Sequence, residues 1–210
     1  MNCRHCQTNL QYLFLDLGTA PPSNAYLTDA DLGKPETYFP LRVFVCHKCW
    51  LVQTQDYSNA SELFNSDYAY FSSTSSSWVE HARRYCQMIT TRMGLSNSSH
   101  VIEIASNDGY LLRNFVAAGI PCLGIEPTAS TAKAAEELGI KVRREFFGQK
   151  LASKLVTENK QADLIIGNNV YAHVPDINDF TKGMKIALKP SGSITLEFPH
   201  LMELLRNSQF

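Results

Sequence analysis

The 210-residue sequence has no long hydrophobic run and no marked excess of charge of either sign. No segment approaches the roughly 20 consecutive apolar residues that a membrane-spanning helix needs, and the N-terminus lacks the apolar core of a secretion signal. Lys and Arg number 19 against 20 Asp and Glu, so the basic surplus typical of a nucleic-acid binder is missing. These absences predict a cytoplasmic protein that binds neither membrane nor nucleic acid.

Cysteine is scarce, but four of the six residues fall in two CxxC pairs. The pairs are Cys3 with Cys6 and Cys46 with Cys49. In an intracellular chain such pairs bind metal more often than they form disulfides, and four thiolates suit the tetrahedral geometry of Zn²⁺. We therefore predict a Cys₄ zinc site. Unrelated thiols, a redox pair, iron in place of zinc and a ligand role for His5 or His47 remain alternatives.

The first half of the chain divides into two segments of different pattern. Residues 1–60 hold both CxxC pairs and strand-like runs at Tyr12–Leu15 and Leu41–Val45, with little helical periodicity. They predict a small β-rich zinc-binding module. Residues 61–97 predict a linker followed by a helix over Trp78–Met93, which Ser76 or Ser77 would cap.

From residue 98 to residue 210, apolar strands alternate with helices. The expected strands are 101–104, 122–125, 140–142, 163–167 and 194–198. The expected helices are 110–118, 128–138, 149–158, 177–188 and 201–205, with Pro190 stopping the fourth. This alternation predicts an α/β fold, a Rossmann-like parallel sheet with helices on both faces.

A candidate cofactor loop follows the first of these strands. Nucleotide cofactors bind at the carboxyl ends of the strands in such sheets. Enzymes that use S-adenosylmethionine (SAM) commonly carry an acidic residue followed by alternating glycines at this place. Here Glu103 is the acidic residue, Ala105 and Asn107 occupy two glycine positions, Gly109 occupies the third, and Ser106 lies between them. Asn tolerates the positive φ that the pattern needs, although a plain strand-to-helix turn would also fit.

Two further sites strengthen the assignment to SAM. Glu126, followed by Pro127, ends the next strand, where an acidic residue can accept hydrogen bonds from ribose hydroxyls. Enzymes that bind NAD share this feature, but their GxGxxG pattern is absent here. Asn168 and Asn169 follow the fourth strand, where contacts with the methionine end of SAM and with the acceptor are expected. His173, five residues after Asn168, is either catalytic or a structural loop residue.

Seven stretches spread over the chain together resemble one family. They are CRHC, CHKC, DYAYFSSTSSSWVEHARRY, EIASNDGYLL, GIEP, NNVYAHVPD and LEFPH. The sequence is similar to the zinc-containing, SAM-dependent sugar C-methyltransferases of deoxysugar biosynthesis. The resemblance implies methylation of carbon 3 of a nucleotide-linked 4-keto sugar, which would be the partner of this protein. It also implies that Tyr68 and His173 lie near the sugar and assist catalysis.

The sequence departs from that family at its C-terminus. A Tyr-His-Glu-His-type motif that supplies the base follows the fifth strand and its helix in the family, and this sequence ends at Phe210, where the motif should begin. Five strands are predicted where such sheets have seven. We therefore expect a fragment that lacks the catalytic base. The alternatives are a non-catalytic module that binds SAM and zinc, and a methyltransferase for another small-molecule acceptor.

Overall fold

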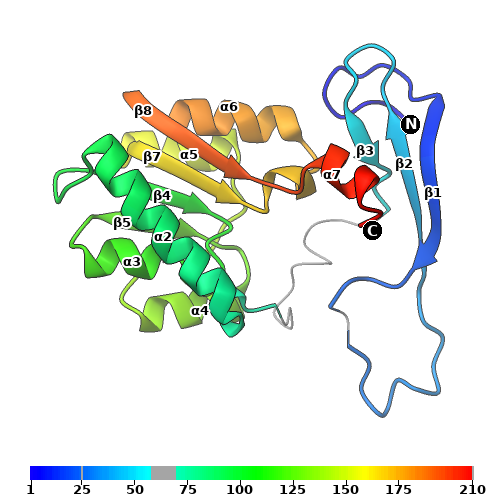
Figure 1. Ribbon diagram of the computed structural model, residues 1–210, viewed down its shortest axis with the longest axis horizontal. Coiled ribbons are helices and arrows are strands. Elements are labelled where there is room, and N and C mark those ends of the chain that lie inside the picture. Colours follow the sequence, from blue (N-terminus) through cyan, green and yellow to red (C-terminus); the bar gives the residue numbers. More distant parts are fainter. Residues whose placement is uncertain (25, 58–69, 210) are drawn as a thin grey trace. The chain divides into compact units, whose positions relative to one another are not determined.

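The computed structural model describes residues 1–24, 26–57 and 70–209. It forms two compact units (Figure 1). The first comprises Met1–Tyr70 with Pro175–Asn178, and the second comprises Phe71–Val174 with Asp179–Phe210.

The first unit is built on a three-stranded antiparallel sheet. Its strands are β1 (Tyr12–Ala20), β2 (Phe39–Val45) and β3 (Val52–Thr54), in the order β1-β2-β3. The two strands that the sequence predicts are present and longer than expected, whereas β3 was not predicted. The hydrophobic core among the described residues consists of Cys3, Leu10 and Cys46, with Cys6, Phe44, Cys49 and Leu51 packed against them. Since thiols make up much of this small core, the unit depends on what they bind.

The second unit contains a five-stranded parallel sheet, which confirms the predicted α/β fold. Its strands are β4 (Val101–Ile104), β5 (Cys122–Ile125), β6 (Lys141–Arg143), β7 (Ala162–Asn168) and β8 (Leu188–Glu197). Their order is β6-β5-β4-β7-β8, and every neighbouring pair is parallel. The direction of the strand order reverses between β4 and β7. In open α/β sheets, ligands bind at such a reversal, beyond the carboxyl ends of the strands.

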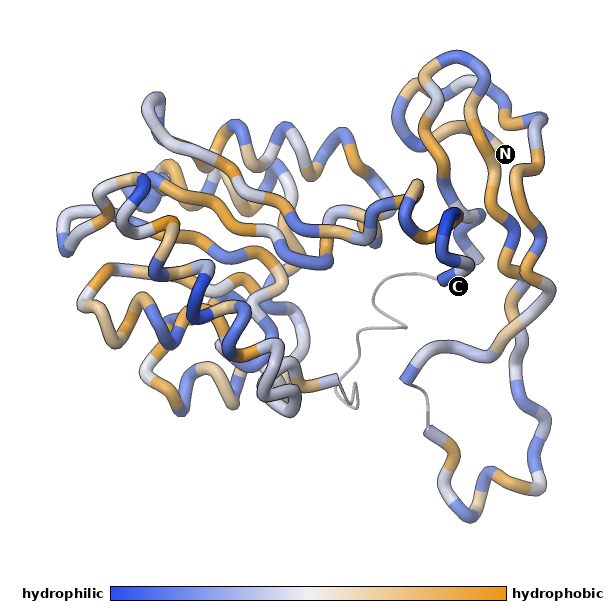
Figure 2. Tube along the Cα trace, in the orientation of Figure 1, coloured by the Kyte–Doolittle hydropathy of each residue, from blue (hydrophilic) through white to orange (hydrophobic). Residues whose placement is uncertain are grey.

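Helices cover both faces of this sheet (Figure 1). They are α2 (Ser76–Met93), α3 (Leu112–Ala117), α4 (Ala129–Glu137), α5 (Gln149–Thr157) and α6 (Ile177–Ala187). A short helix, α7 (Leu201–Arg206), follows β8 and buries none of its residues, and two 3₁₀ turns, η1 (Ser72–Thr74) and η2 (Tyr171–His173), precede α2 and α6. Buried residues of α2, α3 and α4 form one hydrophobic cluster, and those of α5 and α6 form a second. The helices alternate between hydrophobic and hydrophilic residues along their turns (Figure 2), as expected when one side packs on a sheet.

Strand β4 lies at the centre of the sheet and is buried along its whole length. Val101 belongs to the cluster under α2 and α3, whereas Ile102 and Ile104 belong to the cluster under α5 and α6. Because successive side chains of a strand point to opposite faces, Glu103 points to the same face as Val101. A carboxyl group is thus placed on the α2 side of the sheet, at the end of the strand that leads into the candidate cofactor loop.

Several boundaries differ from the sequence predictions, among them those of α2, α3 and β8. Helix α2 is capped by Ser75, whose hydroxyl accepts a hydrogen bond from the Trp78 N–H, rather than by Ser76 or Ser77. The helix expected over 110–118 begins at Leu112. Strand β8 begins at Leu188, well before the expected start, because its register on β7 shifts between Leu188 and Ser193 and the bulge accommodates Pro190.

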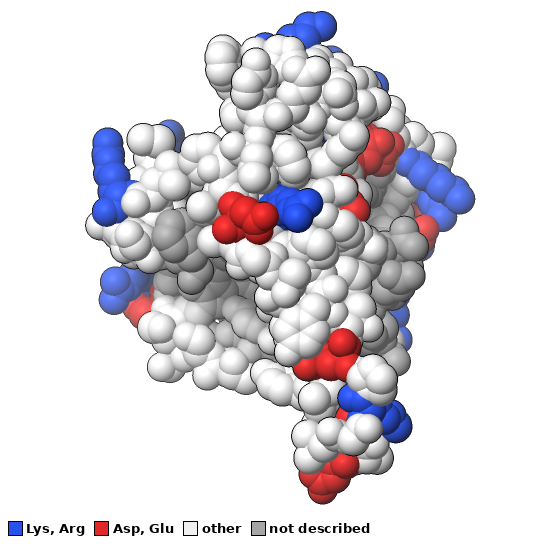
Figure 3. All heavy atoms as spheres, turned by 90° about the vertical axis from the view of Figure 1, so that its right-hand side faces the viewer, with Lys and Arg blue, Asp and Glu red and all other residues white. Residues whose placement is uncertain are grey.

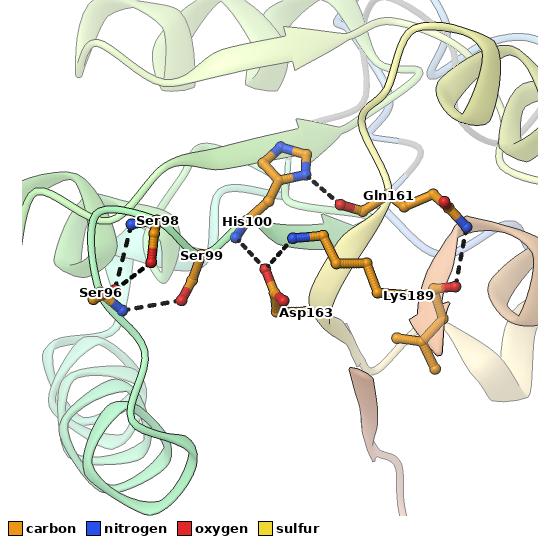
Figure 4. Close-up of polar contacts among 8 residues, drawn as sticks. Ser96, Ser98, Ser99, His100, Gln161, Asp163 and Lys189 are labelled. Carbon is orange, nitrogen blue, oxygen red and sulfur yellow. Dashed lines mark hydrogen bonds and ion pairs between the residues drawn. The ribbon is translucent and has the colours of Figure 1, made fainter. Parts of the chain in front are cut away.

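A polar network ties the amino-terminal ends of β4, β7 and β8 together (Figure 4). The Asp163 carboxylate accepts hydrogen bonds from the His100 backbone N–H and from Lys189 Nζ, both at 2.7 Å. The Gln161 side chain donates to the carbonyls of Ile186 and Leu188. This network lies at the end of the sheet opposite to the expected cofactor site, so it contributes to stability rather than to ligand binding.

The surface shows no large block of one charge on the face that Figure 3 presents. Lys and Arg side chains there are scattered among Asp and Glu, and most of the face is uncharged. Among the described residues, no helix is both long enough and apolar enough to cross a membrane.

Candidate cofactor site and metal centre

The four cysteines of the CxxC pairs converge on one point in the first unit. Their sulfur atoms all lie within 4.8 Å of one another. Cys3 Sγ is 3.6 Å from Cys49 Sγ, and Cys6 Sγ is 3.5 Å from Cys46 Sγ. Four sulfurs bound tetrahedrally at about 2.3 Å from Zn²⁺ would be about 3.8 Å apart. The cluster therefore fits a tetrahedral Cys₄ zinc ion without rearrangement of the chain.

The two CxxC turns have the same backbone design. The Gln7 N–H donates to the Cys3 carbonyl and the Trp50 N–H donates to the Cys46 carbonyl, both at 2.9 Å. Gln7 and Trp50 each adopt a left-handed backbone conformation, with φ of 61° and 64°. Each turn thus directs two thiols to the same side, as a shared metal requires.

The two histidines inside the turns are not part of the cluster. His5 Nδ1 lies 2.8 Å from Asn178 Oδ1, and the His47 ring packs edge-on against Tyr12. Their side chains are therefore engaged elsewhere, and the ligand set is the four cysteines.

The four thiols differ in their surroundings. Burial raises the pKa of Cys49 to about 12, whereas hydrogen bonds with Thr8 lower the pKa of Cys6 to about 6. A bound Zn²⁺ favours the thiolate form of every ligand, so metal binding would release protons from the cluster.

The candidate cofactor loop joins β4 to α3 in the second unit. Ala105, Asn107 and Gly109 all have positive φ, of 58°, 50° and 79°. The expected left-handed conformation of Asn107 is confirmed. Ala105 adopts the same region although its Cβ disfavours it, so the loop stores a small strain.

Two backbone N–H groups of the 3₁₀ turn η1 hold the loop. The Ser72 N–H donates to Asn107 Oδ1 at 2.9 Å, and the Ser73 N–H donates to Asp108 Oδ2 at 3.0 Å. Sequence reasoning treated this serine-rich stretch as a linker. Because main-chain donors of η1 bind the two polar side chains of the loop, the stretch is part of the site.

Glu126, at the end of β5, is oriented by two backbone amides. Its Oε2 accepts a hydrogen bond from the Asn107 N–H at 3.0 Å, and its Oε1 accepts one from the Thr128 N–H at 2.9 Å. Pro127 separates Glu126 from Thr128 in the sequence, and Glu126 is only 5% exposed. Each carboxylate oxygen can accept a further hydrogen bond, which suits a ligand that carries hydroxyl groups.

Several buried polar atoms around the loop have no hydrogen-bond partner among the described residues. They are both carboxyl oxygens of Glu103 and the hydroxyls of Ser106, Thr128 and Ser130. Buried polar groups are nearly always paired, so such a concentration indicates a place where a polar ligand binds. The backbone also approaches closely there: a Cβ on Gly124 would lie 2.4 Å from Ser106 Oγ. The residues present therefore fit the polar cofactor that the loop predicts.

The surroundings of Glu103 favour the protonated form of its carboxyl group. Burial raises the pKa of its carboxyl group well above the usual value, and repulsion by Asp108 and Glu126 adds to the effect. The protonated group can donate a hydrogen bond as well as accept one.

The second group of predicted residues lies at the carboxyl end of β7. Asn168 is the last residue of that strand, and Asn169 follows with a φ of 51°. A side-chain hydrogen bond joins Asn168 to Tyr110, which directly follows the cofactor loop. The structure thus brings the predicted residues on β4 and β7 to the same edge of the sheet.

His173 ends the turn η2, five residues after Asn168. His173 is an exposed residue, yet neighbouring atoms partly desolvate its ring, and this desolvation lowers the pKa of the imidazole. His173 is therefore largely neutral near pH 7 and offers one N–H donor and one nitrogen acceptor. Tyr68, the other predicted catalytic residue, lies outside the described residues.

A strand order that reverses beside a loop with orphaned polar atoms, together with a Cys₄ cluster in a separate β-unit, defines a SAM-dependent methyltransferase with a zinc-binding domain. The methyltransferase domain family matches residues 78–208, and the chain belongs to that family. Residues 3–64 match a zinc binding domain family. The predicted cofactors, SAM and zinc, are thereby confirmed.

Two similar proteins extend this result. The chain is 32% identical over 208 residues to the C-methyltransferase NovU of Streptomyces niveus, covering 99% of this chain and 49% of NovU. It therefore spans about half the length of that relative. The crystal structure of PH0226 from Pyrococcus horikoshii is 20% identical with a TM-score of 0.55, covering 67% of this chain and 66% of that one. This likeness shows a shared fold.

Proposed function

We propose that the chain is part of a C-methyltransferase that acts on a nucleotide-linked 4-keto deoxysugar. The observation that carries the proposal is the similarity to a C-methyltransferase over 99% of the chain, through the zinc-binding domain as well as the methyltransferase domain. The seven motifs that resemble sugar C-methyltransferases support the sugar as acceptor.

The proposed cofactor site combines the loop after β4 with the ends of β5 and β7. Its residues are Glu103, Ala105, Ser106, Asn107, Gly109, Glu126, Pro127, Asn168 and Asn169. When bound, SAM supplies an electrophilic methyl group on its sulfonium sulfur. Glu126 would receive the ribose hydroxyls, because two backbone amides already fix its carboxylate in a buried position.

The acceptor chemistry requires a carbon nucleophile. A ketone acidifies the adjacent C–H bond, and when a base removes that proton the electron pair moves to the ketone oxygen. A donor placed at this oxygen stabilises the enolate. The neutral imidazole of His173 can supply such a donor, and Tyr68 is proposed to help position the sugar. By the family resemblance, the base belongs to a motif that follows the fifth strand and its helix.

The first test is calorimetric titration of SAM and S-adenosylhomocysteine into the zinc-loaded chain. Saturable binding of both is expected. The second test supplies the intact gene product with ¹³C-methyl SAM and thymidine diphosphate 4-keto-6-deoxyglucose. We expect a methyl group bonded to carbon by NMR, and exchange of the hydrogen at carbon 3 with deuterated water.

Three results would change the proposal in different ways. Methyl transfer to oxygen or nitrogen would overturn the carbon acceptor. Transfer to another small molecule with none to the sugar would overturn the acceptor class alone. Binding of SAM without transfer by the intact protein to any acceptor would favour a non-catalytic module.

A further inference from the structure

A polar pair that sequence reasoning did not single out lies between α2 and β8. His81 Nε2 is 2.7 Å from Glu197 Oε2. One turn further along α2, the Tyr85 hydroxyl bonds Thr195 Oγ1, two residues earlier in β8. Residues four apart on a helix, and two apart on a strand, share a face. The two pairs are therefore successive contacts of one helix face with one sheet face.

The pair lies at the ligand-binding edge of the sheet. Glu197 is the last residue of β8 and is in register with Asn168, the last residue of β7. The Asn169 N–H donates to the Glu197 carbonyl at 2.7 Å. Glu197 is thus a neighbour of Asn168 and Asn169, two proposed cofactor residues. It lies on β8, which is one strand further from the cofactor loop than β7.

Stacked aromatic rings connect His81 to the cofactor loop. The Trp78 indole stacks on the His81 ring with centroids 5.0 Å apart, and on the Tyr110 ring with centroids 6.1 Å apart. Tyr110 directly follows Gly109 of the loop. Trp78 on one side and the bond to Glu197 at Nε2 together fix the orientation of the imidazole.

The carboxylate of Glu197 is only partly used by this contact. The side chains of His81 and Glu197 are 49% and 36% exposed. Within residues 1–24, 26–57 and 70–209, no hydrogen bond reaches Glu197 Oε1. Polar contacts between half-exposed side chains contribute little to stability, so stabilisation of the fold does not account for the pair. It presents an oriented carboxylate oxygen beside the proposed site.

We propose that His81 and Glu197 form a binding pair for a polyhydroxylated acceptor. Glu197 Oε1 accepts a hydrogen bond from a hydroxyl group of the acceptor, and His81 is a positioning residue that holds the carboxylate in place. Hydrogen bonds to an ionised carboxylate are stronger than those between neutral groups. The inference rests on the proposed function, because it takes the acceptor to be a sugar.

The test measures binding and kinetics of the intact gene product with thymidine diphosphate 4-keto-6-deoxyglucose as the probe. Glu197→Gln removes the charge and keeps the shape, and should raise KM for the sugar about tenfold. His81→Ala should also raise KM, whereas His81→Gln, whose amide nitrogen can replace Nε2, should restore most of the wild-type value. The affinity for SAM, measured by calorimetry, should change less than about twofold in all three.

Tyr85→Phe is the matched control, because it removes the neighbouring contact between α2 and β8 and leaves the pair intact. Its KM for the sugar should equal that of the wild type. A wild-type KM in Glu197→Gln would overturn the inference. So would an equal rise in Tyr85→Phe and His81→Ala, because docking of α2 would then explain both.

Equilibrium binding of the same sugar in the presence of S-adenosylhomocysteine separates the inference from the proposed function. If the wild type binds the sugar without methylating it, the proposed reaction fails, and the ratio of dissociation constants for wild type and Glu197→Gln still decides the role of the pair. If the wild type does not bind the sugar, both are overturned. If the wild type and Glu197→Gln bind and methylate the sugar equally well, only the role of the pair is overturned.

Discussion

Glu126 Oε2 accepts a hydrogen bond from the backbone N–H of Asn107 at 3.0 Å, which joins the end of β5 to the loop after β4. The two residues are 19 positions apart in the sequence, and this contact fixes both at the carboxyl ends of the neighbouring strands β4 and β5. The left-handed conformation of Asn107 turns its N–H towards the carboxylate, and the second amide, of Thr128, holds the other oxygen. The conformation of the cofactor loop and the orientation of the Glu126 carboxylate therefore depend on each other.

Glu126→Ala should weaken SAM binding by about 1–3 kcal/mol, because ribose hydroxyls would lose a charged partner and the Asn107 N–H would lose its acceptor. Calorimetric titration of the zinc-loaded chain measures the effect. Glu137→Ala is the control, since Glu137 is an exposed acidic residue at the end of α4. Equal affinities of the two variants would remove Glu126 from the site.

Cys46→Ser should release zinc and loosen the unit that holds β1, β2 and β3. Cys46 is fully buried within the cluster, and a serine hydroxyl is a poor replacement for a thiolate ligand. Elemental analysis should fall from one zinc per chain to nearly none, and hydrogen exchange in this unit should quicken. Cys122→Ala, in β5, should keep its zinc. Full zinc content in Cys46→Ser would contradict the Cys₄ assignment.

Ala105→Gly should stabilise the second unit by up to about 1 kcal/mol. A non-glycine residue in the left-handed region costs about 1–2 kcal/mol, and the greater entropy of glycine in the unfolded chain offsets part of the gain. Thermal unfolding measures the change. Gly109→Ala should have the opposite effect on stability, because Gly109 has a φ of 79° and the added Cβ would lie 2.3 Å from Ile140 Cδ1. We expect it to destabilise by more than about 2 kcal/mol.

The sequence predicted the parts of the fold that local pattern determines. Strands β4 and β5 occur at the predicted residues, because short apolar runs between turn signals can only be buried strands here. The CxxC spacing likewise predicted the metal cluster, and Asn107 predicted a positive φ. In each case a few neighbouring residues carry the whole signal.

The remaining features depend on partners that are distant in the sequence. The hydrogen bonds between η1 and the cofactor loop span 35 residues, and the contact of His81 with Glu197 spans 116. No local pattern indicates them. Where several serines are adjacent, the hydroxyl that caps α2 is set by the path of the chain. Pro190 lies in β8 at a register shift in the pairing with β7, and no local pattern predicts that shift.

Asp163→Asn should remove a contribution to stability that depends on pH. Burial disfavours the ionised carboxyl group, but hydrogen bonds from Lys189 and from the His100 N–H outweigh it and lower the pKa of Asp163 (Figure 4). A carboxyl group with a lowered pKa stabilises the fold at pH values above its usual pKa of about 3.9. This stabilisation is lost as the pH falls through the folded-state pKa.

The variant should therefore be less stable than the wild type by about 1–2 kcal/mol at pH 7, and the difference should shrink below about pH 4. Urea unfolding at several pH values measures it. Lys189→Met should lose part of the same stability. A difference that stays constant from pH 7 to pH 3 would show that ionisation of Asp163 is not the cause.

Glu103→Gln should raise stability and weaken cofactor binding in the same protein. The pKa of Glu103 is raised mainly by burial, so the protonated form stabilises the fold below the usual pKa of about 4.3, and stability is lost as the pH rises towards the folded-state value. Glutamine cannot ionise, so its advantage in thermal unfolding should grow as the pH rises above about 4.3. SAM affinity should fall by about 1 kcal/mol, because the carboxyl group has no protein partner among the described residues and is proposed to serve the ligand. If Glu103→Gln is more stable but binds SAM as tightly as the wild type, Glu103 does not contact the cofactor.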